Sequence, residues 1–203
     1  MKKYLMVTPQ LGDELLAENV YEPVDNGFLL FGPTHFPVIP LINSSLVNED
    51  AIEVITVTYD IPSCHQNLEL LKSEVGSVCE SKNATYSLTS IEVPFDDSIQ
   101  AVLDVYTQLI SHLEDGDELY ADITYGSKPM PIVLIMALQY AYRVKDDVSI
   151  ECVVYGQISH HKETKDAKVF DVTALVQLDE IVRLMADGNV SDPASVIGLI
   201  IGK

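Results

Sequence analysis

Apolar positions along the chain alternate between short runs typical of strands and longer runs with helical spacing. Segment 51–59 reads AIEVITVTY, β-branched and alternating as in a strand, whereas 63–81 carries leucines at helical spacing, with Ser63 as its expected N-cap. The predicted strands are 4–7, 51–59, 85–93, 118–124, 149–155 and 168–172. The predicted helices are 36–46, 63–81, 98–113, 129–144 and 174–186. Glycine, proline and asparagine interrupt any period between 11 and 31, so no element is predicted there.

Strands that alternate with helices predict an α/β fold. The repeated βαβ unit favours a Rossmann-like, mainly parallel sheet with helices on both faces. Only the short segment 160–166 separates the last two strands, which predicts an antiparallel edge strand or hairpin near the C-terminus. We expect residues 1–186 to form one ligand-binding domain. Residues 187–203 then form a C-terminal linker or the start of an absent effector segment.

Charge restricts the kinds of partner. The 203 residues include 12 basic and 31 acidic side chains, a formal net charge of −19, which repels long nucleic acids. A small anion in a pocket is still permitted, because bulk charge is screened beyond about 8–10 Å. The chain has no tryptophan, so aromatic stacking on a ligand falls to tyrosine, phenylalanine or histidine.

Cysteine spacing and hydropathy indicate the cellular compartment in which the protein is expected. The three cysteines form no C-x-x-C pair, which excludes a zinc knuckle or a thioredoxin-like motif and favours reduced thiols. No signal peptide is recognised, and the longest apolar stretch is shorter than the ~20 residues that span a bilayer. These features predict a cytoplasmic protein without a membrane partner.

The most informative segment is D-I-T-Y-G-S-K-P-M at 122–130, where a predicted strand turns into a helix. In an open parallel sheet, ligands bind beyond the carboxyl ends of the strands. Gly126 lets a ligand approach the backbone, and free amides at the helix start favour an anion. Lys128 adds a positive charge beside the hydroxyls of Thr124 and Ser127. The segment therefore predicts a phosphate site.

Other interpretations of this segment stay open. It is neither a Walker loop nor a G-x-G-x-x-G fingerprint. Asp122 can simply cap the turn, Gly126 can serve only the chain reversal, and Lys128 can be a solvated surface lysine. A lysine at the mouth of a buried strand, in so acidic a chain, favours the phosphate site.

The helix at 129–144 is apolar nearly all round. Such a helix needs cover on more than one face. Either it is the central helix of a monomer, or it forms a dimer interface that brings two copies of the Lys128 turn together around a two-fold axis. Elsewhere, His160 and His161 are adjacent in a polar segment, and adjacent side chains on a strand point apart. We therefore predict no metal site and no cofactor.

Segment 122–130 resembles the strand–turn–helix motif of CRISPR-associated Rossmann-fold (CARF) domains. That motif has an acidic or amide residue, then Thr, Gly, and Lys or Arg with a following Met. The sequence T-P-Q-L-G at 8–12 stands where the family carries its first ligand loop. V-V-Y-G at 153–156 and F-D-V-T at 170–173 are similar to the family's closing strands. The resemblance covers roughly residues 1–186, and its specific part is about ten residues long.

The resemblance implies a homodimer that binds a cyclic oligoadenylate, with the tetra-adenylate favoured, in a cleft across the two-fold axis. Such domains sense this second messenger in type III CRISPR antiviral defence and control an effector, which is often fused. The chain shows no R-x-x-x-x-H nuclease motif, so it is a stand-alone protein or the sensory part of a longer one. The ligand-binding residues that the resemblance implies are Thr8, Pro9, Gln10, Leu11, Asp122, Thr124, Tyr125, Gly126, Ser127, Lys128 and Met130.

Two alternatives accompany this hypothesis. Some family members are ring nucleases, in which the ribose 2′-hydroxyl attacks the neighbouring phosphate without a metal. In that case Lys128 and Ser127 are the catalytic candidates, because they can stabilise charge on the phosphoryl oxygens. The other alternative is a non-catalytic Rossmann-type interaction domain whose turn is purely structural.

Overall fold

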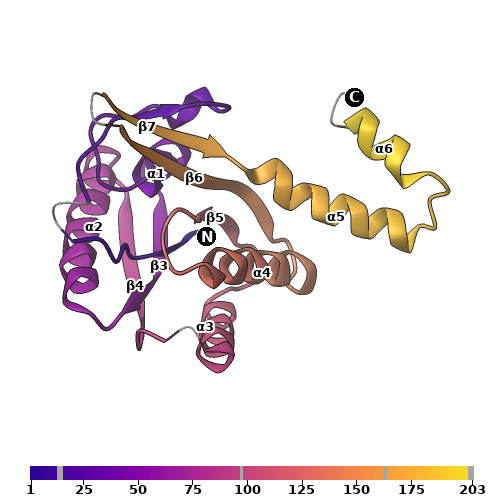
Figure 1. Ribbon diagram of the computed structural model, residues 1–203, viewed down its shortest axis with the longest axis horizontal. Helices are drawn as coiled ribbons and strands as arrows, with labels where there is room; N and C mark the ends of the chain where they lie inside the picture. The colour runs from indigo at the N-terminus through magenta and orange to yellow at the C-terminus, as the bar shows by residue number, and fades with distance from the viewer. Residues whose placement is uncertain (13–15, 97, 162–163, 201–203) are drawn as a thin grey trace.

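One sheet organises the computed structural model of the chain, which describes residues 1–12, 16–96, 98–161 and 164–200 (Figure 1). Its strands are β1 (Lys2–Val7), β2 (Tyr21–Pro23), β3 (Ala51–Tyr59), β4 (Thr85–Val93), β5 (Glu118–Asp122), β6 (Ser149–His161) and β7 (Thr164–Asp171). Within the described residues their order is β2-β7-β6-β5-β1-β3-β4. β1, β3, β4, β5 and β6 run parallel, and β7 is antiparallel to β6.

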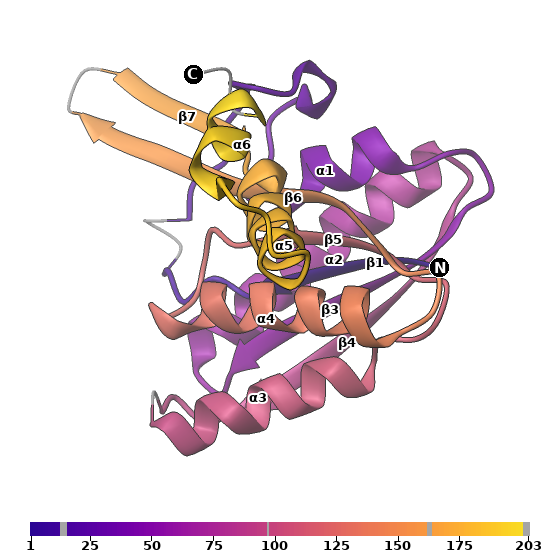
Figure 2. The same ribbon diagram turned by 90° about the vertical axis from the view of Figure 1, so that its right-hand side faces the viewer.

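Helices cover both faces of the sheet. They are the 3-10 helix η1 (Gly27–Leu29), α1 (Val38–Ser45), α2 (Pro62–Ser81), α3 (Ile99–Ser111), α4 (Pro129–Val144), α5 (Thr173–Asp187) and α6 (Pro193–Ile200). Figure 2 shows α1 and α2 on one face and α3 and α4 on the other. The predicted Rossmann-like α/β fold is therefore confirmed.

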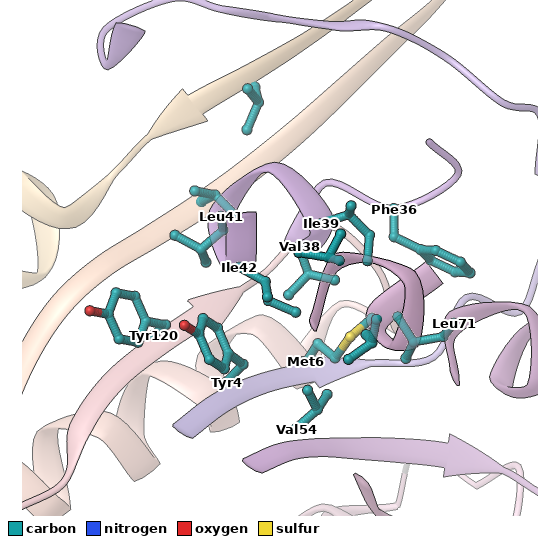
Figure 3. Packing of buried hydrophobic residues seen from close by; sticks show 14 of the residues in the cluster. Tyr4, Met6, Phe36, Val38, Ile39, Leu41, Ile42, Val54, Leu71 and Tyr120 are labelled. Carbon is teal, nitrogen blue, oxygen red and sulfur yellow. The ribbon is translucent and has the colours of Figure 1, made fainter. Parts of the chain in front are cut away.

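The central strands are buried on both faces, and so they read as nearly continuous apolar runs. Tyr4 and Met6 of β1 belong to the core beneath α1 and α2, as Figure 3 shows, whereas Leu5 and Val7 pack toward α3 and α4. The rings of Tyr4 and Tyr120 stack at 4.8 Å between centroids. Because successive side chains of a strand point to opposite faces of the sheet, each residue of β1 belongs to the hydrophobic core on one face or the other.

The C-terminal strands form the predicted hairpin, but β7 is not the edge of the sheet. β2 pairs in parallel with β7, with Tyr21 opposite Ala167, and so lies outside it. No element was predicted in this segment because β2 is only three residues long and ends in Pro23. Both hairpin strands also continue into the predicted connection at 160–166, where backbone pairing extends to His161 and Thr164.

Two further details of the prediction were wrong. Ser63 does not cap α2, because Ile61 is the N-cap residue and Pro62 takes the first helical position. The Ser63 hydroxyl instead donates to the carbonyl of Gln10 at 3.1 Å. The strand predicted at 118–124 ends at Asp122, where the chain leaves the sheet.

α5 leads away from the sheet, and α6 lies beyond its far end (Figure 1). Arg143 of α4 fastens α5 by pairing with Asp179 and Glu180, each at 2.8 Å. No residue of α6 is buried in the described part of the chain, and residues 201–203 of the predicted C-terminal segment lie outside that part. None of the described helices combines the length and apolar character needed to cross a membrane.

Candidate functional site

The carboxyl edge of the sheet brings the two predicted ligand segments together. β1, β3 and β5 are neighbours in parallel register, so their carboxyl ends open on one edge. The 122–128 turn follows β5, and the 8–12 loop follows β1. The helices α1, α2 and α4 begin at this edge, because each connects back toward the start of a parallel strand.

Beneath the turn, backbone pairing between strands ends with β5, and side-chain hydrogen bonds of Asp122 and Thr124 take over from it. One carboxylate oxygen of Asp122 accepts from the Thr124 amide at 2.9 Å and from the Thr124 hydroxyl. The same hydroxyl accepts from the amide of Gly156 at 2.7 Å. The side chain of Thr124 thus takes the place of a backbone acceptor for β6 and ties the turn to the hairpin.

The Asp122 carboxyl is an unusual group at this position. Its side chain is 1% exposed, and its second oxygen, Oδ2, has no hydrogen-bond partner among the described residues. Burial raises its pKa to about 6, although the hydrogen bonds from Thr124 oppose that rise, as does the Val38 amide, which lies nearby without a hydrogen bond to Oδ2. Asp122 therefore exchanges a proton in the mildly acidic range.

Two glycines permit close backbone approach around the turn. Gly126 has φ +106°, and an added Cβ would lie 2.9 Å from the Cβ of Met130 and 3.2 Å from Val7. At Gly156, an added Cβ would lie 2.4 Å from the Cγ of Pro37. Neither position has room for another residue, so the turn is pressed against β1 and the hairpin against the start of α1.

The outer surface of the turn is cationic. Lys128 is exposed and makes no ion pair with any described residue, which is also true of Lys82, Lys145 and Lys168. The other described cationic side chains, Lys2, Lys3, Lys72, Arg143 and Arg183, each have a carboxylate partner. Lys128 stands at the N-cap position of α4 without a side-chain cap. The predicted free amides are absent from residues 129–131, because Pro129 and Pro131 have no N–H group and the Met130 amide donates to the carbonyl of Ser127 at 2.9 Å. Beside Lys128, the hydroxyls of Ser127 and Tyr59 are 3.1 Å apart. A lysine ammonium beside two hydroxyl groups can bind a phosphate group.

The 8–12 loop is held by hydrogen bonds to side chains of β3 and α2. The buried hydroxyl of Thr8 bonds to Thr56 and Thr58 of β3 at 2.8 and 3.0 Å. Asn67 of α2 donates to the carbonyls of Pro9 and Leu11 at 2.9 and 2.8 Å. The loop is therefore held in place by its own carbonyl oxygens.

Burial divides the predicted site residues into two groups. The side chains with at least partial exposure belong to Gln10, Leu11, Thr124, Ser127 and Lys128, to which the exposed backbone of Gly126 is added. The buried ones are Thr8, Pro9, Asp122, Tyr125 and Met130. The structure brings all of them to one edge of the sheet, but only the first group faces solvent, and the second group supports it.

The supporting residues were missed from the sequence. Tyr59, Asn67 and Gly156 come from three different elements and meet the predicted segments only in the folded chain. The one available signal was the pair of threonines, Thr56 and Thr58, in the otherwise apolar strand β3.

An apolar groove of about 510 Å³ lies next to the turn, between α4 and α5. Its lining includes Ile123, Ile132, Met136, Tyr155, Val172 and Leu175. Leu175 is 68% exposed and Ile132 is 62% exposed. The predicted all-round apolar character of α4 thus leaves part of that helix uncovered in the single chain. We name this surface the α4–α5 groove.

In the described part of the chain, no group of three or more His, Cys, Asp or Glu side chains is arranged to hold a metal ion. His160 and His161 end β6, but their side chains lie outside the described residues.

Comparison with known proteins gives one informative match. The chain is similar to the CRISPR-associated protein MJ1674 of Methanocaldococcus jannaschii, with 29% identity over 89 residues. The matched region is 44% of this chain but only 14% of that protein. No protein-family model matches the chain. The similarity supports a CRISPR-related role.

Proposed function

We propose that the chain is a CARF domain that binds a cyclic oligoadenylate at the 122–128 turn, across a homodimer cleft, and controls an effector. The observation that carries this proposal is Lys128, an unpaired cation among the described residues, on a rigid turn at the carboxyl edge of a very acidic protein. The similarity to a CRISPR-associated protein supports the same role.

The α4–α5 groove supports a second copy of the chain as the dimer partner. Ile123 and Tyr155 line the groove and directly precede Thr124 and Gly156, so the groove is continuous with the turn. Covering this groove with a second copy buries exposed apolar side chains and brings two Lys128 residues to the same cleft. A ring of adenylates has rotational symmetry, so each half of a two-fold cleft can offer it the same donors.

Ring cleavage is the second candidate function. The hydroxyl pair of Ser127 and Tyr59 lies beside Lys128, where it can orient a ribose or stabilise charge on a phosphoryl oxygen. The attacking group is the ribose 2′-hydroxyl of the ligand itself, so the protein needs no nucleophile. Ser127 and Lys128 serve either function.

The test is a calorimetric titration with cyclic tri-, tetra- and hexa-adenylate, with chromatography of the ligand afterwards. We expect tight binding of one ring, the tetra-adenylate, per dimer. Lys128→Ala should weaken binding about 100-fold or more, because each ring loses two charge-assisted hydrogen bonds. Lys145→Ala, at the opposite end of α4, is the matched control and should bind like the wild type.

The outcomes separate the alternatives. An intact ring after incubation indicates a sensor, whereas linear fragments indicate a ring nuclease. Absence of binding to every ring, or a Lys128→Ala variant that binds like the wild type, contradicts the proposal and favours an interaction domain. Light scattering on the same samples must give a dimer, and a ring-bound monomer contradicts the two-fold cleft.

A further inference from the structure

An exposed aromatic ring lies on the same edge of the sheet as the Lys128 turn. Phe95 comes after the end of β4 and is 62% exposed. Its ring meets the ring of Tyr59 edge-on, with centroids 5.3 Å apart and an interplanar angle of 75°. The ring is therefore held by a buried neighbour while a large part of it faces solvent.

A short series of contacts joins this ring to the turn. The hydroxyl of Tyr59 lies 3.1 Å from the hydroxyl of Ser127, the residue before Lys128. Tyr59 also pairs with Val93 across β3 and β4, and Phe95 follows two residues after Val93, beyond the end of β4. One buried tyrosine thus positions both a phosphate-binding turn and an exposed aromatic ring.

Charge distinguishes the two ends of this series. At the turn, Lys128 supplies a positive charge with no acidic partner among the described residues. Beside Phe95, the carboxylate of Asp96 accepts from the amide and hydroxyl of Ser98 at 2.8 and 2.9 Å, and these bonds hold its pKa below the usual value. The surroundings of Phe95 therefore repel phosphate but accept an uncharged aromatic group.

We propose that Phe95 is a stacking platform for a nucleobase of the ligand whose phosphate Lys128 binds. A nucleotide carries an anionic phosphate and a neutral aromatic base on one ribose, which matches this pairing of cation and ring. Stacking on an aromatic side chain acts on any base, so Phe95 contributes affinity, and the larger purines gain most. This inference rests on the proposed function and adds a base-binding residue to it.

The absence of tryptophan from the chain provides a direct probe. Phe95→Trp introduces a single fluorophore at the proposed platform, and Phe28→Trp introduces one at another exposed phenylalanine, which is 84% exposed on η1. On titration with cyclic tetra-adenylate, we expect saturable quenching of the tryptophan in Phe95→Trp and an unchanged signal in Phe28→Trp.

Affinity supplies the second measurement. Phe95→Ala should weaken binding of the ring about 5- to 150-fold, the usual effect of removing one stacked aromatic side chain. Phe95→Leu keeps an apolar side chain but no ring, so it should lose most of the same affinity. Phe28→Ala is the matched control, and urea unfolding of every variant checks that the fold is retained.

The failure of this inference differs from the failure of the proposed function. A wild-type protein that binds no ring, or a Lys128→Ala variant that binds normally, overturns both. If the wild type binds and Lys128→Ala weakens binding, but Phe95→Ala binds normally and Phe95→Trp is not quenched, only the stacking role of Phe95 is wrong.

Discussion

The strands on either side of β6 end in the same pattern, Asp-x-Thr, but the two turns differ in the residues beyond the threonine. Asp122 is the last residue of β5, and Thr124 follows it in the turn. Asp171 is the last residue of β7, and Thr173 is the first residue of α5. In both turns the aspartate accepts from the amide and the hydroxyl of the threonine. In both, the threonine hydroxyl then accepts from an amide of β6, at 2.7 Å for Gly156 and 2.8 Å for Val153.

The two aspartates differ in their second oxygen. That of Asp171 accepts from Asn26 at 2.9 Å, whereas that of Asp122 has no partner among the described residues. Burial raises the pKa of Asp122 to about 6. Burial also acts on Asp171, but hydrogen bonds from Thr173 and Asn26 outweigh it and hold the pKa of that carboxyl below its usual value.

The chain beyond each threonine also differs. After Thr173 the chain is already helical, whereas Tyr125, Gly126, Ser127 and Lys128 separate Thr124 from α4. The shared Asp-x-Thr pattern thus follows the end of a strand and supplies a hydrogen-bond acceptor to an amide of the neighbouring strand β6. The inserted residues are the part that creates an open cationic surface.

The largest effect that tests this comparison is expected at Gly126, in the inserted segment. Gly126→Ala should lower the free energy of unfolding by about 2–4 kcal/mol, because it combines an unfavourable backbone conformation with a clash against Met130. Gly116→Ala is the control, since Gly116 also has a positive φ, +75°, but no atom within 4 Å of the added Cβ. The control should lose only about 1–2 kcal/mol.

Urea unfolding of both glycine variants provides the measurement. Equal losses at the two positions would mean that the turn is not pressed against Met130 and Val7. The variant at Gly126 should also bind cyclic tetra-adenylate more weakly than the Gly116 variant, because the displaced turn carries Lys128.

The next effect concerns the pH dependence of stability, and its sign differs between the two aspartates. Asp122 has a raised pKa in the folded state, so the unfolded chain releases its proton first as the pH rises. Its contribution to the free energy of unfolding therefore falls by up to about 3 kcal/mol between about pH 4 and pH 6. Asp122→Asn should remove this loss.

Asp171 provides the opposite case. Its pKa is lowered in the folded state, so it stabilises the protein above the pKa of the unfolded chain and loses that contribution as the pH falls through the folded value. Asp171→Asn should therefore lower the free energy of unfolding above about pH 4, and its difference from the wild type should shrink as the pH falls below that value. Urea unfolding of the wild type and both variants from about pH 3 to about pH 8 tests both signs, and parallel profiles for the two variants would contradict the comparison.

The sequence alone predicted those parts of the fold whose signal lies in a contiguous pattern. The predicted bounds 51–59, 85–93 and 129–144 coincide with β3, β4 and α4, which are long and strongly patterned. β2 was missed because three residues at the edge of a sheet show no period, and because Pro23 argues against a strand.

The sequence predicted where the candidate site lies, but not which of its residues are buried. The motif at 122–130 located the turn, whereas the assignment of Thr8 and Asp122 to the buried side depends on the register of β1 and β5 in the sheet. The meeting of Tyr59, Ser127 and Phe95 could not be predicted, because it joins the ends of separate strands. Spacing within one segment carries no information about such a contact.

The smallest effect is expected at the two threonines, which also test most directly whether the turns have different roles. Thr124→Val and Thr173→Val each leave one amide of β6 without its acceptor, which costs about 1–3 kcal/mol. Thr173 is 7% exposed, whereas Thr124 is half-buried and water can replace part of its bonding, so Thr173→Val should be the more destabilising change. Urea unfolding measures this difference.

Ligand affinity should show the reverse order. Thr124→Val should weaken binding of cyclic tetra-adenylate, because the threonine hydroxyl orients the segment that carries Lys128, and Thr173→Val should leave the affinity unchanged. Thr124→Ser retains a hydroxyl and should restore both affinity and stability, which separates the loss of the hydrogen bond from a change of packing. If both valine variants bind the ring equally, the two Asp-x-Thr turns are equivalent supports, and the functional difference lies in the inserted residues alone.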